Sequence, residues 1–119
     1  MKLLIVDDSN MSRKALIVAL PAELRESCEC LEATNGEEAV QLYKKEHPDI
    51  VFLDLTMPVM NGYDALRLIM QYDSQAKVIV VSSDSQAGAV KLVSVFGAKA
   101  HITKPVSTAV LELALKKFF

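Results

Sequence analysis

The most apolar segment of the chain is Ile50-Val51-Phe52-Leu53, and the residue that follows it is Asp54. A continuous run of apolar, partly β-branched side chains is typical of a strand that is covered on both faces, as in a parallel sheet. We therefore expect a central strand that delivers the Asp54 carboxylate to the carboxyl-end edge of the sheet. Open α/β sheets bind their ligands at this edge.

Strand-like and helix-like patterns alternate on both sides of this segment. The connections between successive strands are too long for hairpins, which predicts parallel strands with helices packed on both faces. We therefore expect an α/β fold with a five-stranded parallel sheet. The expected strands are residues 2–6, 28–33, 50–53, 77–81 and 100–103, and the expected helices are residues 10–20, 37–46, 63–72, 85–96 and 107–117.

The composition is that of one small domain with no obvious membrane or nucleic-acid partner. A chain of 119 residues fits a single domain over 1–119. The net charge is −2 and the basic residues are dispersed, which argues against nucleic-acid binding and membrane insertion. The early acids Asp7 and Asp8 interrupt any signal peptide, so we expect a cytoplasmic protein. In that compartment Cys28 and Cys30 are expected to be buried strand residues rather than a disulfide or a zinc site.

Polar residues stand where four of the expected strands end. Asp7 and Asp8 follow the first strand, Asp54 the third, Ser82 the fourth and Lys104 the fifth. In a parallel sheet these ends share one edge, so three carboxylates, a hydroxyl and an ammonium should converge. Such a set suits a hard divalent cation and the transfer of a phosphoryl group to a carboxylate.

Clustered carboxylates repel one another, and Mg²⁺ would offset the cost. The expected direct ligands are Asp8 and Asp54, with Asp7 bound through water and the Thr56 carbonyl completing the set. Asp54 is the candidate nucleophile. Each residue also has a plainer explanation: Asp7 and Asp8 as a helix cap, Asp54 as a turn residue, Ser82 bonded to backbone and Lys104 solvated.

The whole chain resembles the response-regulator receiver domains, and most of all their single-domain chemotaxis members. The segments that carry this resemblance are Leu4-Ile5-Val6-Asp7-Asp8-Ser9 with Arg13, Ala33-Thr34-Asn35-Gly36, Asp49-Ile50-Val51-Phe52-Leu53-Asp54, Met57-Pro58 with Asn61-Gly62, Val81-Ser82, Gly97-Ala98-Lys99 and Lys104-Pro105. Together they form a highly specific pattern.

The resemblance implies a flavodoxin-like fold with strand order 2-1-3-4-5 and a signalling switch rather than a turnover enzyme. It implies that Asp54 accepts a phosphoryl group from a sensor-kinase phosphohistidine, and that Mg²⁺ binds Asp7, Asp8, Asp54 and the Thr56 carbonyl. It further implies that Ser82 is the switch hydroxyl, that Lys104 contacts the phosphoryl group, and that the Lys104-Pro105 bond is cis.

The sequence departs from the family pattern at one position of the expected switch. The usual Tyr or Phe of the fifth strand is replaced by His101, which is found in some phosphorelay intermediates; its plainer explanation is a partly exposed surface histidine. Thr56 and Asp84 flank the expected pocket and would tune the access of water to an acyl phosphate.

The expected fourth helix has more apolar residues than one core stripe requires. We expect a partner face that includes Val90, Val93 and His101, formed by the fourth helix, the fifth strand and the fifth helix. The alternative is ordinary packing against the fifth helix. The expected partners are a chemotaxis-type histidine kinase and a downstream target or phosphatase.

Four other functions are compatible with the fold. The segment could be the receiver of a longer regulator with an output module, or a phosphorelay intermediate, although no output segment follows residue 119 in this sequence. A Mg²⁺-dependent phosphatase with an Asp nucleophile is disfavoured, because Thr56 stands where such enzymes place a second Asp. A binding-only pseudo-receiver is disfavoured because every pocket residue is present.

Overall fold

The computed structural model describes residues 1–83 and 86–118, which form a three-layer α/β domain. Its central layer is a five-stranded sheet with the order β2-β1-β3-β4-β5, and all four strand pairings are parallel. The predicted fold class and strand order are confirmed. The strands are β1 (Lys2–Val6), β2 (Glu29–Ala33), β3 (Ile50–Leu53), β4 (Val78–Ser82) and β5 (Ala100–Thr103).

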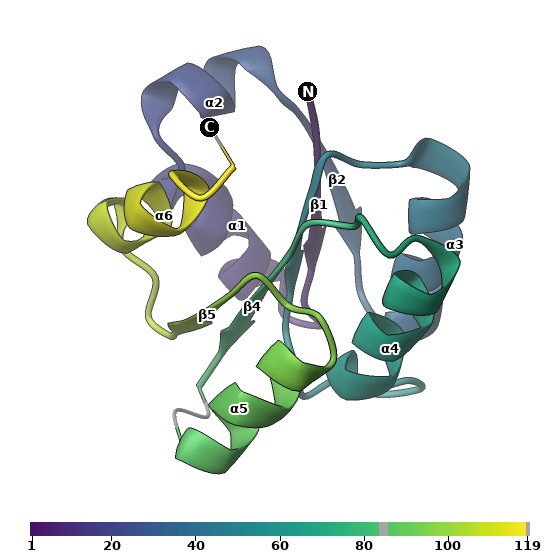
Figure 1. Ribbon diagram of the computed structural model, residues 1–119. Coiled ribbons are helices and arrows are strands. Elements are labelled where there is room, and N and C mark those ends of the chain that lie inside the picture. Colours follow the sequence, from purple (N-terminus) through teal and green to yellow (C-terminus); the bar gives the residue numbers. More distant parts are fainter. Residues whose placement is uncertain (84–85, 119) are drawn as a thin grey trace.

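Helices cover both faces of the sheet (Figure 1). One face packs against α1, α2 and α6, and the other packs against α3, α4 and α5. The helices are α1 (Asn10–Ala19), α2 (Ala22–Ser27), α3 (Gly36–Glu46), α4 (Gly62–Tyr72), α5 (Ala87–Val95) and α6 (Thr108–Leu115). None of these helices, within the described part of the chain, has the length and apolar character needed to span a bilayer.

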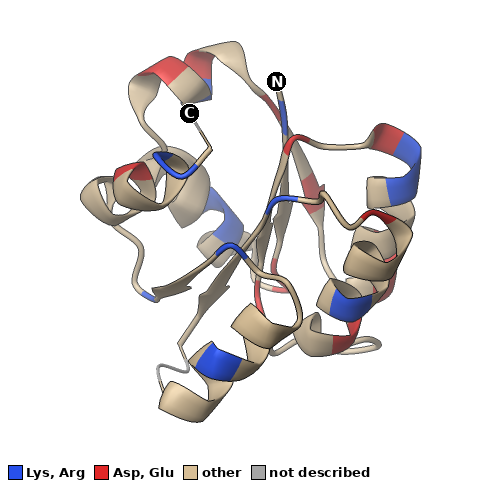
Figure 2. Cartoon of the chain, in the orientation of Figure 1, with Lys and Arg blue, Asp and Glu red and all other residues tan. Residues whose placement is uncertain are grey.

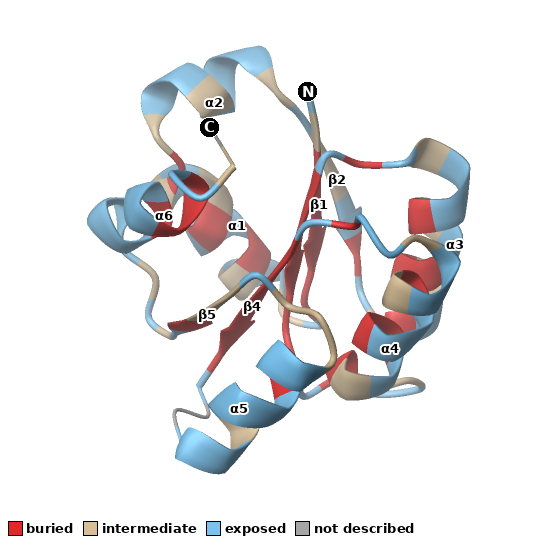
Figure 3. Cartoon of the chain, in the orientation of Figure 1, coloured by how far each residue is buried: buried red, intermediate tan, exposed pale blue. Residues whose placement is uncertain are grey.

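Successive side chains of β3 enter opposite halves of the core. Ile50 and Phe52 pack on the side of α1 and α6, whereas Val51 and Leu53 pack on the side of α3 and α4. All four residues are buried. The neighbouring strands β1 and β4 are buried along most of their length as well (Figure 3). Burial on both faces explains why this strand is a continuous apolar run rather than an alternating one.

Side-chain caps fix where several helices begin. The side chains of Ser9, Asn35, Asn61 and Ser107 each accept a hydrogen bond from a backbone N–H in the first turn of the helix that follows. At the other end of α5, Gly97 has a φ of 109°, the left-handed conformation that often ends a helix. Ser107 and Gly97 thus mark the start of α6 and the end of α5.

Two expectations about burial are wrong. Cys28 and Cys30 are only half-buried free thiols. Cys30 lies on the edge strand β2, which shields it less than a central strand would, and Cys28 caps the end of α2 and is not a strand residue. Val93 is 1% exposed and belongs to the core between α5 and the sheet, so it cannot form part of an exposed partner face. The fourth helix was expected to begin at Ser85, and Asp84 was expected to flank the pocket. Both residues lie outside the described part of the chain.

Candidate functional site

Three acidic residues meet at the carboxyl ends of β1 and β3. One carboxylate oxygen from each of Asp7, Asp8 and Asp54 lies within 4.8 Å of the others. Strand pairing continues just past the strand ends: the Asp7 amide donates to the Ala33 carbonyl at 3.1 Å, and the Asp54 amide donates to the Val6 carbonyl at 3.0 Å. The acids are therefore held by the sheet itself rather than by a free loop.

The three acids differ in their exposure to solvent. Asp7 and Asp54 are 6% and 7% exposed, whereas Asp8 is exposed. Two carboxylates in a nearly dry environment are costly unless a cation accompanies them. The protein supplies one such cation from the end of β5.

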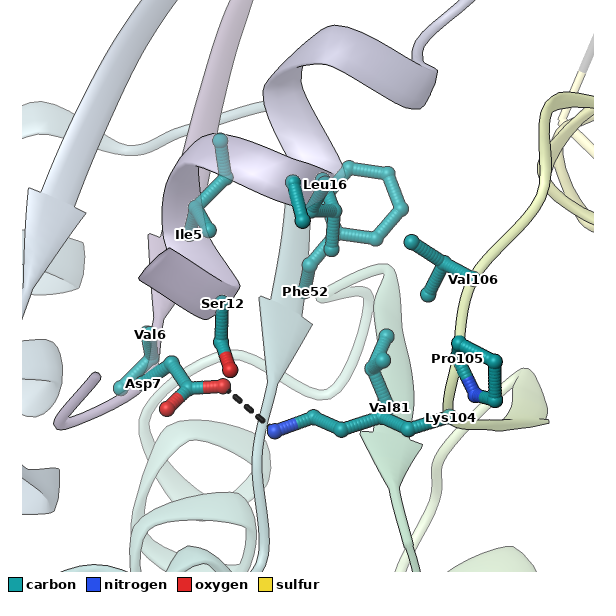
Figure 4. A pocket seen from close by; sticks show the side chains of 11 residues that line it. Ile5, Val6, Asp7, Ser12, Leu16, Phe52, Val81, Lys104, Pro105 and Val106 are labelled. Atoms are coloured by element: carbon teal, nitrogen blue, oxygen red, sulfur yellow. Dashed lines mark hydrogen bonds and ion pairs between the residues drawn. The ribbon is translucent and has the colours of Figure 1, made fainter. Parts of the chain in front are cut away.

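Lys104 reaches across the sheet edge to the acids. Its Nζ lies 2.6 Å from Asp7 Oδ2 (Figure 4). The same Nζ lies 3.6 Å from Asp54 Oδ1. The Lys104 amide donates to the Ser82 carbonyl at 2.9 Å, so the ends of β4 and β5 are tied together. Ser82 is 2% exposed, and the Lys104-Pro105 bond is cis, as the resemblance implied.

The electrostatics of the site reflect burial opposed by this ion pair. Burial raises the pKa of Asp54; the ammonium of Lys104 opposes the shift, and the charge of Asp7 adds to it. For Lys104, burial lowers the pKa, but the hydrogen bond to Asp7 and the charge of Asp54 outweigh it, and the pKa is raised. The site therefore holds a firmly protonated lysine beside an aspartate that resists ionisation.

This shift predicts that the Asp54 carboxylate destabilises the metal-free fold. Because folding raises its pKa, the folded state holds this proton more tightly than the unfolded state does, and stability falls as the pH rises through that range. We expect Asp54→Asn to increase the free energy of unfolding by about 1 kcal/mol at pH 7 in the absence of metal. The gain should shrink as the pH falls toward 4 and vanish below about pH 3, where the aspartate is protonated in both states.

The measurement is thermal or urea unfolding of both proteins across this pH range, with a chelator present. Asp64→Asn is the matched control, because Asp64 is an exposed aspartate on α4 whose nearest cation, Arg67, is 3.9 Å away. We expect it to change stability by less than about 0.5 kcal/mol. A metal-free Asp54→Asn variant that is less stable at pH 7 would show that the carboxylate has a structural role.

Further contacts fix Asp7. The Ser9 amide donates to Asp7 Oδ1 at 2.9 Å, and Arg13 Nη1 donates to the Asp7 backbone carbonyl at 2.7 Å. Arg13 is 7% exposed although it is charged. Arg13 belongs to the family pattern, but its sequence context predicts no role for it. A basic residue five positions after the paired acids is the only signal in the sequence.

The remaining predicted residues lie on the loop after β3, on β5 and on α5. Thr56 is exposed in the loop two residues after Asp54, and the role of its carbonyl stays a prediction. His101 lies on the edge strand β5, half-buried, and its Nε2 is buried without a hydrogen-bond partner among the described residues. Val90 on α5 is 36% exposed and borders the same depression as His101.

A cavity of about 340 Å³ lies beside the acid cluster, between α1 and the segment that follows β5. Its walls are mainly apolar, and the ion pair of Asp7 and Lys104 stands at one end (Figure 4). The residues that line it are Ile5, Val6, Asp7, Ser12, Ala15, Leu16, Phe52, Val81, Lys104, Pro105 and Val106. The ion pair thus borders both the acid cluster and this mainly apolar cavity.

The donor set fits a Mg²⁺ ion. Mg²⁺ prefers hard oxygen ligands, tolerates few protein ligands and keeps several waters. The cluster offers three carboxylates, one of them exposed to solvent, and the cationic side chain nearest to them reaches Asp7 from the β5 side. A carboxylate beside a cation site and an ammonium is the arrangement needed for phosphoryl transfer to an aspartate.

Comparison with known proteins agrees with this geometry. The response regulator receiver domain family matches residues 3–116. The chain is 43% identical over 119 residues to the chemotaxis protein CheY of Thermotoga maritima, covering 98% of this chain and 95% of that protein. It is 40% identical to a protein-glutamate methylesterase/protein-glutamine glutaminase of Pyrococcus horikoshii, covering 94% of this chain but 30% of that protein.

A solved structure gives the same result. CheY in the CheX–CheY–BeF₃–Mg²⁺ complex from Borrelia burgdorferi superposes with a TM-score of 0.90 at 38% identity, covering 100% of this chain and 90% of that one. The family match spans nearly the whole chain and includes every residue of the acid cluster. The chain therefore belongs to the response regulator receiver domains and is a phosphorylatable response regulator of the chemotaxis type.

Proposed function

We propose that Asp54 is the phosphoacceptor of this response regulator and that a chemotaxis-type sensor kinase is its phosphodonor. The observation that carries the proposal is the position of Asp54. Its carboxylate is nearly buried at the end of the central strand, between two other acids and 3.6 Å from the Lys104 ammonium. A candidate nucleophile, a cationic side chain and two further carboxylates able to hold a metal ion thus share one small site.

In the proposed reaction an Asp54 oxygen attacks the phosphorus of a phosphohistidine. The phosphorus–nitrogen bond breaks, the imidazole leaves, and an aspartyl phosphate forms. A Mg²⁺ ion held by Asp7, Asp8, Asp54 and the Thr56 carbonyl would supply charge neutralisation at the phosphoryl oxygens. Lys104 would pair with another of these oxygens, since its Nζ already reaches both Asp7 and Asp54.

The same residues provide a route from phosphorylation to a partner face. Ser82 is the proposed switch hydroxyl, and the strand that follows in the sheet, β5, carries His101. The proposed face consists of the exposed sides of α5, β5 and α6, with Val90 and His101 at its centre. α5 bears only one charged residue, Lys91, which suits contact with an apolar surface of a downstream target or phosphatase (Figure 2).

The proposal describes a switch that modifies itself, not an enzyme that turns over phosphate esters. Thr56 occupies the position where an Asp-nucleophile phosphatase needs a second acid. We also propose one receiver domain over 1–119 in the cytoplasm; the two free thiols, Cys28 and Cys30, suit a reducing compartment. A receiver within a longer regulator is the second candidate, because the methylesterase relative is much longer than this chain.

The test is incubation with a small phosphodonor, with and without Mg²⁺, followed by intact-mass measurement. We expect the addition of one phosphate per chain in Mg²⁺ and very little in a chelator. A parallel assay with a phosphomonoester such as p-nitrophenyl phosphate should show no sustained turnover. Continuous release of product from the phosphomonoester would favour a phosphatase, and the absence of labelling in Mg²⁺ would contradict the proposal.

A further inference from the structure

Arg13 is a charged residue that the fold has buried directly behind the acid cluster. It lies in the first turns of α1 and is 7% exposed. Nη1 donates to the Asp7 carbonyl at 2.7 Å, Nε donates to Glu32 Oε1 at 2.8 Å, and Nη2 donates to the Asn10 side-chain oxygen. All three nitrogens of one guanidinium therefore have partners, on three different elements.

These contacts tie together the end of β1, the start of α1 and strand β2. The Asp7 carbonyl belongs to the peptide that joins Asp7 to Asp8. A hydrogen bond to this oxygen therefore restrains the peptide plane that contains the Cα atoms of both aspartates. The Asp7 carboxylate has its own anchors in the Ser9 amide and Lys104. Asp8 is exposed, and its direction depends on the backbone that Arg13 holds.

Burying a guanidinium is expensive unless its hydrogen bonds are satisfied. Arginine suits this position because its guanidinium carries donors on three separate nitrogens in one rigid plane, whereas lysine has a single nitrogen on a flexible stem and cannot span three partners so far apart. Glu32, whose side chain is 44% exposed, balances the charge from the solvent side. The arrangement is therefore specific to the geometry of a guanidinium and not only to a positive charge.

We propose that Arg13 is a positioning residue of the metal site: by holding the peptide between Asp7 and Asp8, it sets the affinity of the acid cluster for Mg²⁺ without touching the ion. The inference rests on the proposed function only for the identity of the cation. It concerns the folded protein before any phosphoryl group arrives.

The direction in which the Mg²⁺ affinity changes when Arg13 is replaced separates a positioning role from a purely electrostatic one. A cation near three acids weakens metal binding by repulsion, so removing its charge should strengthen the binding of Mg²⁺ if charge is all that matters. If Arg13 positions the acids, its removal should weaken binding in spite of the lost repulsion. Outer residues that orient metal ligands typically change metal affinity by about 10- to 100-fold when mutated.

The experiment is a titration with Mg²⁺ alone, followed by amide chemical shifts, on the unaltered protein, Arg13→Gln and Arg13→Lys. We expect both variants to bind Mg²⁺ about tenfold more weakly, since lysine keeps the charge but loses the fork. Tyr43→Phe is the control for general destabilisation: it removes the hydrogen bond from Tyr43 to Asp73, at the opposite end of the sheet. That variant should lose stability and keep its Mg²⁺ affinity.

Tighter binding by Arg13→Gln would overturn the inference in favour of a charge effect, and unchanged binding by both Arg13 variants would reduce Arg13 to a structural residue. A second measurement needs no metal. Hydrogen exchange of the Ser9 amide, which donates to Asp7, should quicken about tenfold or more in Arg13→Gln relative to Tyr43→Phe. If the unaltered protein fails to bind Mg²⁺, the proposed cofactor is wrong, and this exchange rate alone decides the role of Arg13.

Discussion

Asp54→Asn is expected to abolish phosphorylation of the protein by small phosphodonors. The amide has nearly the same shape as the carboxylate, so the fold and the neighbouring acids stay in place, but its nitrogen and oxygen are poor nucleophiles and form no stable acyl phosphate. Intact-mass measurement after incubation with phosphodonor and Mg²⁺ should show one added phosphate on the unaltered protein. The variant should show none.

Asp64→Asn is the matched control for this loss, as it makes the same chemical change on the exposed surface of α4. It should be labelled as fully as the unaltered protein. Labelling of the Asp54 variant at the rate of the unaltered protein would show that another residue is the phosphoacceptor. A peptide map of the labelled chain would then identify that residue.

The second large effect is expected at Gly62, which has no catalytic role. A Cβ at this position would lie 2.6 Å from the Leu55 Cα and would overlap the carbonyl oxygen of Asp54. Both obstacles are backbone atoms that the pairing of β3 holds in place, so they cannot move aside cheaply. We expect Gly62→Ala to lower the free energy of unfolding by about 3 kcal/mol, which is large for one methyl group.

Gly88→Ala provides the control, because a Cβ at Gly88 meets no atom within 4 Å. In the exposed helix α5 this substitution should be neutral or stabilise the protein by up to about 1 kcal/mol. Urea unfolding of the two variants measures both effects. Equal stability of the two alanine variants would mean that the start of α4 can move away from the backbone at Asp54.

The close approach at Gly62 also links the fold to the site. The Gly62 amide donates to the Leu55 carbonyl at 2.9 Å, so the start of α4 rests directly on the backbone that carries Asp54. Any side chain at position 62 would push this backbone. We therefore expect Gly62→Ala to impair phosphorylation as well as stability.

The existence of the five strands, their parallel arrangement and the position of the acids were predictable from local sequence patterns, with strand ends correct to within one residue. These properties follow from local patterns: apolar runs such as Ile50–Leu53 need cover on both faces, and a residue that directly follows a strand has to lie at the edge of the sheet. The convergence of Asp7, Asp54 and Lys104 follows from the parallel arrangement alone. No knowledge of side-chain packing was needed to expect it.

Packing across the sheet decided what the sequence could not. Val93 and Val90 are both valines of one helix, yet one is buried and the other exposed, because the position of α5 on the sheet sets which side is covered. The three-way contacts of Arg13 depend on β2 lying beside β1. The Lys104 Nζ lies closer to Asp7, at 2.6 Å, than to Asp54, at 3.6 Å. Asp7 is 97 residues away along the chain and Asp54 is 50 residues away, so no local pattern predicts this difference. Local sequence patterns report the periodicity of a segment, whereas these contacts depend on how distant segments are positioned in space.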